Sequence, residues 1–311
     1  MSNKKAIWAL LAVTLAWGGT FVWMQQSLDA AAAAKPQLNQ NWTVTFFVWM
    51  RFTIAALLFP LLFPRARKGF VELDSWKGGG WLGFIVWGGF LLQMFGLKEV
   101  TPAVSAFLTS LYVVFTALIG VVLGRQRLTK FALIGVLLAT FGAAFIDGQP
   151  HLTFGIGEWL TVACAFLFAA HIIATDRITK KTDPLLLTGP MILTVSLLSF
   201  VVFLLWPLRE GGGDELFELL QVRSFLFPLL LCAIFGSLVA LLILNLFQKA
   251  VSPVHAAIIY ALEPVWAAIF SLIMGLEGDF TFWLPLGAAA LLLGNFVIEF
   301  DNVKLPTVEE E

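Results

Sequence analysis

Residues 95–124 read FGLKEVTPAVSAFLTSLYVVFTALIGVVLG, and residues 246–275 read LFQKAVSPVHAAIIYALEPVWAAIFSLIMG. The second stretch repeats the first at an offset of 151 residues, which brings Lys98 onto Lys249 and a Thr-Pro pair onto a Ser-Pro pair. A fixed internal offset of this kind indicates a duplicated structural unit. The stretch is strongly apolar in both copies, so the duplicated unit is expected to lie in a membrane.

The composition is that of a membrane protein. Hydrophobic residues make up 59% and charged residues 13% of the chain, whereas soluble domains have roughly 25% charged residues. A helix needs about twenty apolar residues to cross the hydrocarbon core. The apolar runs are continuous and do not alternate, which favours helices over barrel strands. We therefore expect an all-α polytopic membrane protein with ten transmembrane helices. The runs are 6–28, 42–63, 78–97, 102–123, 130–147, 155–175, 184–206, 225–248, 253–275 and 281–300.

The ten runs divide evenly between two halves, five in residues 1–150 and five in residues 151–311. An odd number of spans in each copy places the second copy upside down in the membrane relative to the first. The predicted fold is therefore two inverted five-helix repeats around a central cavity.

The 19 lysines and arginines are distributed unevenly among the predicted loops. With a cytoplasmic N-terminus, most of them fall on the cytoplasmic side, as the positive-inside rule requires. We therefore expect an integral, multi-pass protein of the plasma (cytoplasmic) membrane with both termini in the cytoplasm. The first run could instead be a cleaved signal peptide, but it aligns with the sixth run, and its removal would break the duplication.

A stripe of polar residues follows one face of the fourth span. Ser105, Thr109 and Tyr112 are spaced four and three residues apart, as one helical face requires. Tyr260 and Glu263 occupy the positions of the ninth span that match the last two of these. Polar groups inside a bilayer usually face a bundle interior or a wet cavity, although hydroxyls also bond to a carbonyl one turn earlier. We expect these five residues to line a substrate path.

Two ionisable residues fall near the middle of spans. An isolated carboxylate there costs several kcal/mol, so Glu263 should be protonated, paired or hydrated, and it is our candidate for proton coupling. The alternative is a structural acid beside the helix break that Pro264 would cause. Arg51 stays charged and must pair, bind an anion or snorkel, with Glu263 and Asp176 as candidate partners.

Five further residues complete the candidate substrate path. Trp17 and Thr20 lie in the first span, and Thr20 aligns with His171 in the sixth. Histidine titrates near neutral pH, although a lone histidine between helices is more often a packing residue. Gln93 and Asn245 are expected either to hydrogen-bond the solute or to bridge helices, and the same two roles are open to Gln248, which is not counted among the path residues.

The sequence predicts no cofactor. The phosphate-binding motif G-x-x-x-x-G-K-[ST] is missing from the sequence. Cys164 and Cys232 each lie within a span, where we expect apolar packing residues rather than metal ligands or a disulfide. No metal and no nucleic acid is expected to bind. The expected partners are a small-molecule substrate and the lipid bilayer.

Several short motifs resemble the EamA domain of the drug/metabolite transporter (DMT) superfamily. They are AWGGTF at 16–21, MRF at 50–52, AFLTSLYVV at 106–114 and LEPV at 262–265. The resemblance covers essentially the whole chain. It implies ten helices in two inverted repeats, a central substrate cavity and no nucleotide hydrolysis. Members that resemble this chain move small metabolites such as amino acids, often outward. The family has no universal binding motif, so the candidate path rests on the polar residues.

These observations favour a secondary active transporter, and through the resemblance an exporter, of small organic metabolites by alternating access. Few charges lie in the spans, which favours neutral or zwitterionic solutes over phosphorylated ones, and amino acids are the first guess. A receptor or scaffold without transport is the alternative. An intramembrane enzyme would need a cluster such as H-E-x-x-H, which the sequence lacks, so we expect no enzymatic activity.

Overall fold

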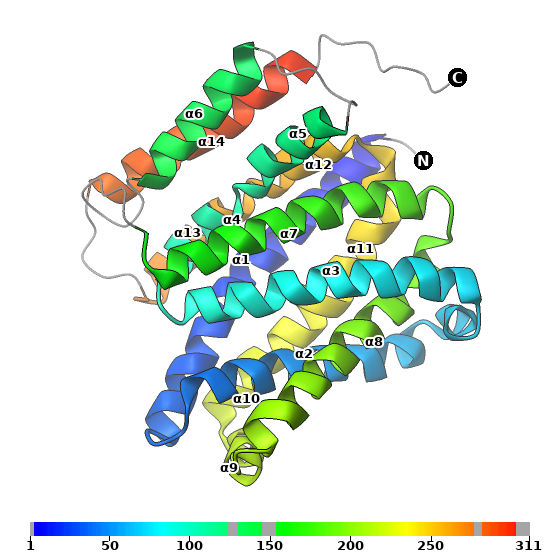
Figure 1. The fold of residues 1–311 in the computed structure, drawn as a ribbon, viewed down its shortest axis with the longest axis vertical. Coiled ribbons are helices and arrows are strands. Elements are labelled where there is room, and N and C mark those ends of the chain that lie inside the picture. The colour runs from blue at the N-terminus through cyan, green and yellow to red at the C-terminus, as the bar shows by residue number, and fades with distance from the viewer. Residues whose placement is uncertain (1–2, 124–129, 145–153, 277–281, 303–311) are drawn as a thin grey trace.

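The computed structural model describes residues 3–123, 130–144, 154–276 and 282–302, and in these ranges the chain is helical and contains no strand. Figure 1 shows a bundle in which α6 and α14 lie side by side at one edge. Short segments are 3-10 helical at η1 (Pro64–Phe70), η3 (Leu219–Gln221) and η5 (Gln248–Ala250), and π-helical at η2 (Leu204–Leu208) and η4 (Cys232–Val239). The α-helices are α1 (Asn3–Ala34), α2 (Gln40–Leu62), α3 (Leu73–Leu97), α4 (Pro102–Thr109), α5 (Tyr112–Val122), α6 (Lys130–Ala144), α7 (Ile156–Thr179), α8 (Pro184–Phe203), α9 (Gly213–Glu218), α10 (Arg223–Leu231), α11 (Ala240–Phe247), α12 (Pro253–Tyr260), α13 (Glu263–Ile273) and α14 (Trp283–Asn302).

Every predicted apolar run carries a helix. Among the described residues, eight helical stretches are long and apolar enough to cross a membrane, judged by length and composition. Four of these stretches combine several elements: α4 with α5, α8 with η2, α10 through η5, and α12 with α13. The two remaining runs carry α6, with 15 described residues, and α14, whose apolar part is short. The prediction of a helical, multi-pass chain is therefore confirmed for eight spans.

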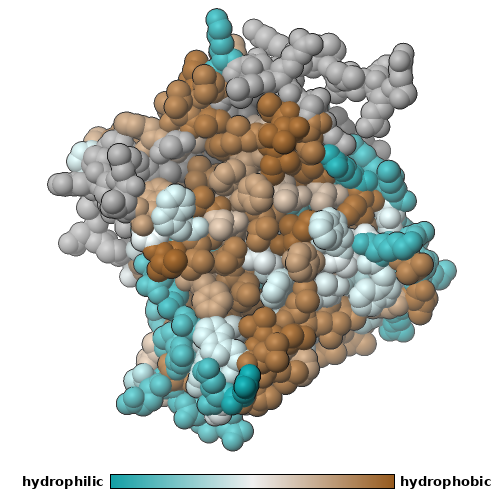
Figure 2. Space-filling view, viewed as in Figure 1, coloured by the Kyte–Doolittle hydropathy of each residue, from teal (hydrophilic) through white to brown (hydrophobic). Residues whose placement is uncertain are grey.

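The surface of the bundle is apolar over its middle. Trp8, Leu57 and Leu205 are 72%, 65% and 67% exposed. In Figure 2 brown covers most of the described middle of this face, and teal gathers at its lower left and right edges. At one hydrophilic end Lys35 donates to Glu218, and this hydrogen bond raises the pKa of Lys35. Such a surface suits lipid around the middle and water at the ends.

The helices of the two halves pack in matching pairs. The last helices of each half, α6 and α14, pack together, and so do the second helices, α2 and α8. α3 packs along α7, and α10 and α11 pack along α1, which is the same pairing with the halves exchanged. α1 also contacts α13, and α7 contacts α5 in the corresponding way. The first span of each half therefore contacts the fourth span of the other half.

Both copies of the duplicated stretch are broken helices, whereas the sequence analysis treats them as continuous spans. α4 ends at Thr109 and α5 begins at Tyr112. α12 ends at Tyr260 and α13 begins at Glu263, at the same offset of 151 residues. The breaks therefore belong to the repeat.

The same tight turn forms both breaks. In the first, the backbone N–H of Leu111 donates to the carbonyl of Leu108 at 3.2 Å. In the second, the N–H of Leu262 donates to the carbonyl of Ile259, also at 3.2 Å. Pro264 lies in the first turn of α13, where its missing N–H removes no bond within the helix. The proline therefore starts a helix here rather than kinking one.

α3 and α8 approach closely at Gly79. A Cβ atom at this position would lie 2.3 Å from the carbonyl oxygen of Leu187 and 3.0 Å from the nitrogen of Met191. A Cβ atom on the next residue, Gly80, would meet Thr194 Oγ1 at an ordinary 3.8 Å. Only a residue without a side chain allows the backbone contact at Gly79.

We expect Gly79→Ala to lower the thermal stability of the purified protein and Gly80→Ala to maintain or raise it. Overpacking costs about 1–3 kcal/mol, whereas alanine for glycine in an open helix position gains roughly 0.5–1 kcal/mol. The measurement is the Tm of both variants in detergent. Equal Tm values would contradict the close contact of α3 with α8.

Candidate functional site

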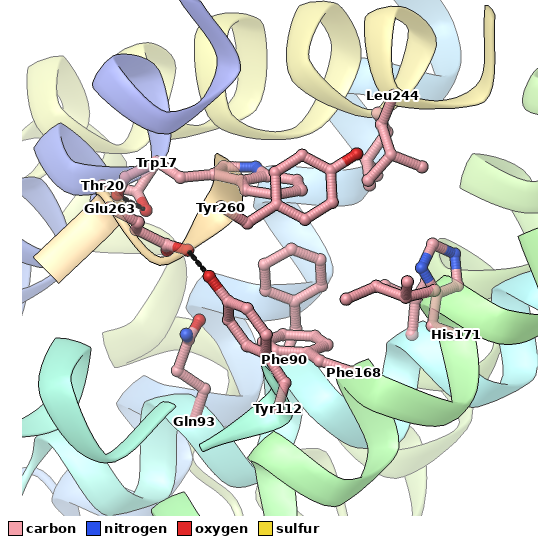
Figure 3. A pocket seen from close by; sticks show the side chains of 13 residues that line it. Trp17, Thr20, Phe90, Gln93, Tyr112, Phe168, His171, Leu244, Tyr260 and Glu263 are labelled. Carbon is pink, nitrogen blue, oxygen red and sulfur yellow. Dashed lines mark hydrogen bonds between the residues drawn. The ribbon is translucent and has the colours of Figure 1, made fainter. Parts of the chain in front are cut away.

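A small cavity lies where α1, α3, α5, α7, α11, α12 and α13 meet (Figure 3). Its volume is about 40 Å³, which is space for a few water molecules. Part of the cavity wall is apolar and is formed by Val86, Phe90, Phe168, Ile172, Leu241 and Leu244. The predicted path residues that line the cavity are Trp17, Thr20, Gln93, Tyr112, His171, Tyr260 and Glu263.

The two copies of the duplicated stretch meet at the cavity through Tyr112 and Glu263. The hydroxyl of Tyr112 donates to Glu263 Oε2 at 3.4 Å, drawn as the dashed line in Figure 3. The two residues occupy equivalent positions, 151 apart, and each begins a helix after a break. A hydrogen bond of this length is weak, so the carboxyl group of Glu263 has capacity for a further partner.

Trp17 and Thr20 form the part of the wall that α1 contributes. The indole N–H of Trp17 donates to the carbonyl of Gly236 at 3.0 Å. The Trp17 ring packs edge-on against Tyr260, with ring centroids 5.5 Å apart. The hydroxyl of Thr20 donates to the carbonyl of Trp17 at 2.7 Å. These contacts hold α1 against η4 on one side and α12 on the other.

Two further polar side chains reach the cavity. Gln93 extends its amide toward the Tyr112–Glu263 pair (Figure 3). His171 is 3% exposed, and its Nε2 has no hydrogen-bond partner among the described residues. Buried polar atoms rarely lack a partner. These groups are therefore the places where water or a solute would bind.

Gln248 bridges two walls of the cavity and is not among the predicted path residues. Its Oε1 accepts a hydrogen bond from the hydroxyl of Tyr260 at 3.1 Å. Its Nε2 donates to the carbonyl of Ile172 at 2.7 Å. Gln248 therefore ties η5 to α12 and α7. The sequence predicted this amide either to hydrogen-bond the solute or to bridge helices, and in the structure it bridges helices.

Besides Arg51, three predicted path residues are buried outside the cavity. Asn245 bridges α11 to α8, because its Nδ2 donates to Thr188 Oγ1 at 2.9 Å. Ser105 and Thr109 are 0% and 1% exposed, and the hydroxyl of Ser105 has no hydrogen-bond partner within the described ranges. Of that stripe, Tyr112, which follows the break, lines the cavity.

Arg51 lies behind the cavity wall. Its Nε donates to Ser237 Oγ at 2.6 Å. Its guanidinium carbon lies 4.6 Å from the centre of the Phe90 ring, which lines the cavity. Neither of the partners that the sequence suggested, Glu263 and Asp176, forms an ion pair with it.

The cavity brings together groups suited to reversible binding. A carboxyl, an amide, an imidazole and two phenol hydroxyls converge inside an apolar bundle. Within the described ranges no three His, Cys, Asp or Glu side chains gather closely enough to hold a metal ion. Cys164 and Cys232 are both buried and are not joined to each other.

Comparisons with known proteins agree with the fold and the repeat. The model of the EamA-like transporter family matches residues 4–147 and again residues 155–300. An uncharacterized transporter of Archaeoglobus fulgidus is 30% identical over 263 residues, which is 84% of this chain and 75% of the relative. YetK, an uncharacterized transporter of Bacillus subtilis, is 29% identical over 270 residues, which is 80% of this chain and 76% of the relative. One solved crystal structure superposes with a TM-score of 0.64 at 16% identity, over 98% of this chain and 100% of that chain, and so shares the fold.

We expect a cysteine placed at Thr20 to react with a small, charged thiol reagent at least about tenfold faster than one placed at Val195, because modification requires access of water to the thiol. Thr20 is 2% exposed but lines the cavity, whereas Val195 is 0% exposed and lies in the apolar core. The native cysteines are both 0% exposed and give a low background. The measurement is the labelling rate by mass spectrometry. Equal, slow rates would show that the cavity is dry.

Proposed function

Because the chain belongs to the EamA-like transporter family, we propose that it is a secondary active transporter, which moves small organic metabolites by alternating access and without nucleotide hydrolysis. It is an integral, multi-pass membrane protein with eight apolar helical stretches. The observation that carries the proposal is the meeting of Tyr112 and Glu263 inside the cavity.

In this proposal residues 1–150 and 151–311 are two inverted five-helix repeats, and α6 and α14 complete a set of ten spans. Three observations support this arrangement. The helix breaks recur at one offset, the helix pairs recur with the halves exchanged, and the family model matches the chain twice. Equivalent residues of two repeats meet only on the axis that relates them, and Tyr112 and Glu263 meet at the cavity. That position favours a cavity shared by both repeats.

The proposed location is the plasma membrane with both termini in the cytoplasm. The support is the excess of lysine and arginine on the side of the N-terminus. The proposed direction is export, by analogy with members of the family that the sequence motifs resemble. A carrier itself runs down the gradient that it is offered, so the direction depends on the coupled gradient.

The cavity chemistry fits a small amphipathic solute, and an amino acid is the first candidate. Trp17, Phe90 and Phe168 offer aromatic surface for an apolar side chain. Gln93 and Glu263 offer an amide and a carboxyl group for a polar head. An α-amino acid carries both kinds of group, whereas a phosphorylated solute would need several cationic partners.

Transport requires the cavity to open. The cavity of about 40 Å³ has space for a few water molecules, so in this proposal its walls move apart to admit an organic solute. Opening toward one side would separate the walls that Gln248 joins. Glu263 is the proposed coupling group, because a proton gained or lost there changes its hydrogen bond with Tyr112.

We expect Glu263→Gln to abolish uptake driven by a pH gradient, with a loss of at least about tenfold, because the amide keeps the shape but carries no exchangeable carboxyl proton. The measurement is flux into liposomes that contain the purified protein, with a mixture of radiolabelled amino acids as the probe. The matched control is Glu158→Gln, because Glu158 is 9% exposed and lies in the first turn of α7, outside the cavity wall.

Three outcomes separate the hypotheses. Loss of pH-driven flux in Glu263→Gln but not in Glu158→Gln supports the coupling role. Unchanged pH-driven flux in Glu263→Gln removes that role and leaves transport intact. No flux of any solute class by the wild-type protein would remove the transporter proposal and leave a receptor or scaffold.

A further inference from the structure

Arg51 is a buried charge without an acidic partner. It lies within α2 and is 1% exposed, so it does not snorkel to the surface. In the described part of the chain no aspartate or glutamate forms an ion pair with it. A guanidinium stays charged at every physiological pH, and a buried ion without a partner is strongly unfavourable. The position is therefore costly unless another group supplies the negative charge.

The Arg51 side chain is held in place by one hydrogen bond, but part of its guanidinium group has no strong acceptor. Ser237 accepts a hydrogen bond from Nε at 2.6 Å. Nη1 faces the sulfur of Met24 at 3.4 Å, and a thioether is only a weak acceptor. Nη2 is buried and has no hydrogen-bond partner among the described residues. Nη1 and Nη2 can therefore still donate to an acceptor. Two such groups side by side bind a carboxylate with two hydrogen bonds.

A single layer of side chains separates Arg51 Nη2 from the cavity. A Cβ atom built on Gly236 would lie 2.9 Å from Arg51 Nη2 and 2.3 Å from the methyl carbon of Thr20. Thr20 and Phe90 both line the cavity, and the Phe90 ring covers the guanidinium carbon at 4.6 Å. In Figure 3 Thr20 lies beside Glu263 on the cavity wall. Movement of Phe90 would therefore connect Arg51 to the cavity.

We propose that Arg51 binds the carboxylate of the transported solute, through Nη1 and Nη2, once Phe90 moves off the guanidinium. This inference rests on the proposed transport function and names the substrate class, a small organic monocarboxylate. The aromatic ring stabilises the cation in the closed state, and the carboxylate replaces it when the solute enters. Glu263, across Thr20, is placed for the amino group of a zwitterion.

A single carboxylate fits this site better than a phosphate does. Phosphate groups are recognised by clusters of arginine and lysine. In the described structure the Arg51 guanidinium contacts Ser237, Met24, Phe52 and Phe90 and lies near Cys232, and none of these residues is basic. The single positive charge of Arg51 therefore matches the single negative charge of a carboxylate.

The test compares a carboxylate with the same molecule without its charge. The probes are 4-methylpentanoate and 4-methylpentanamide, and the variants are Arg51→Met and Arg51→Gln. The readout is the Kd from thermal stabilisation of each purified protein in detergent, in a low-salt buffer free of carboxylate anions and again with added chloride. We expect the wild type to bind the acid at least about tenfold more tightly than the amide, and both variants to lose this preference while staying folded.

Arg177→Met is the matched control. Arg177 is a half-buried arginine of α7 whose Nε also lacks a hydrogen-bond partner among the described residues, but it does not line the cavity. We expect this variant to keep the preference for the acid.

Several results would overturn the inference. They are equal binding of acid and amide by the wild type, an undiminished preference in either Arg51 variant, failure of both variants to fold, and the same stabilisation by chloride alone. The last would identify a site for a small inorganic anion. Because the readout is binding, a lack of flux in liposomes with the acid preference intact would contradict the proposed transport function and leave the carboxylate site standing.

Discussion

The hydrogen bond between Tyr112 and Glu263 joins the two copies of the duplicated stretch at the points where both helices are broken. A broken helix leaves backbone groups that hydrocarbon cannot satisfy, so a break inside a membrane is tolerated only where it faces protein or water. Here both breaks lie beside the same cavity. They turn two polar side chains into the same cavity, and α1 and α7 pack around them. The site therefore depends on the two breaks being adjacent.

The positions of the helices could be predicted from the sequence, but the breaks could not. An apolar run must become a helix because lipid leaves the backbone no other partner, and each predicted run carries one. A single tight turn leaves the apolar pattern almost unchanged, so Ser110 and Leu111 give no signal in the first copy. In the second copy Pro264 is a signal, but a proline break is predicted there only as the alternative to a coupling role of Glu263, and the structure places this proline in the first turn of a new helix.

The candidate site was predictable where residues matched between the halves. Tyr112 and Glu263 match, as do Thr20 and His171, and all four line the cavity. Ser105 and Thr109 lie outside the cavity, although Tyr260, which matches Thr109 and also precedes a break, lines it. Spacing also cannot say which neighbouring helix supplies a partner. Asn245 and Gln248 are three residues apart, yet one bonds to Thr188 on α8 and the other joins two cavity walls.

The bridge at Gln248 makes the two ends of the cavity unequal. At the offset of 151 the position of Gln248 is taken by Leu97, and that of Tyr260 by Thr109. The related end therefore lacks these two hydrogen bonds. Each such bond contributes about 1 kcal/mol, so in the proposed alternating-access cycle the two together would favour closure at the Gln248 end by a factor of about 30. Alternating access needs both closed forms within a few kcal/mol of each other. Under the proposed mechanism, apolar packing at the other end would contribute a similar amount, and a solute in the cavity would shift the balance by binding one form better.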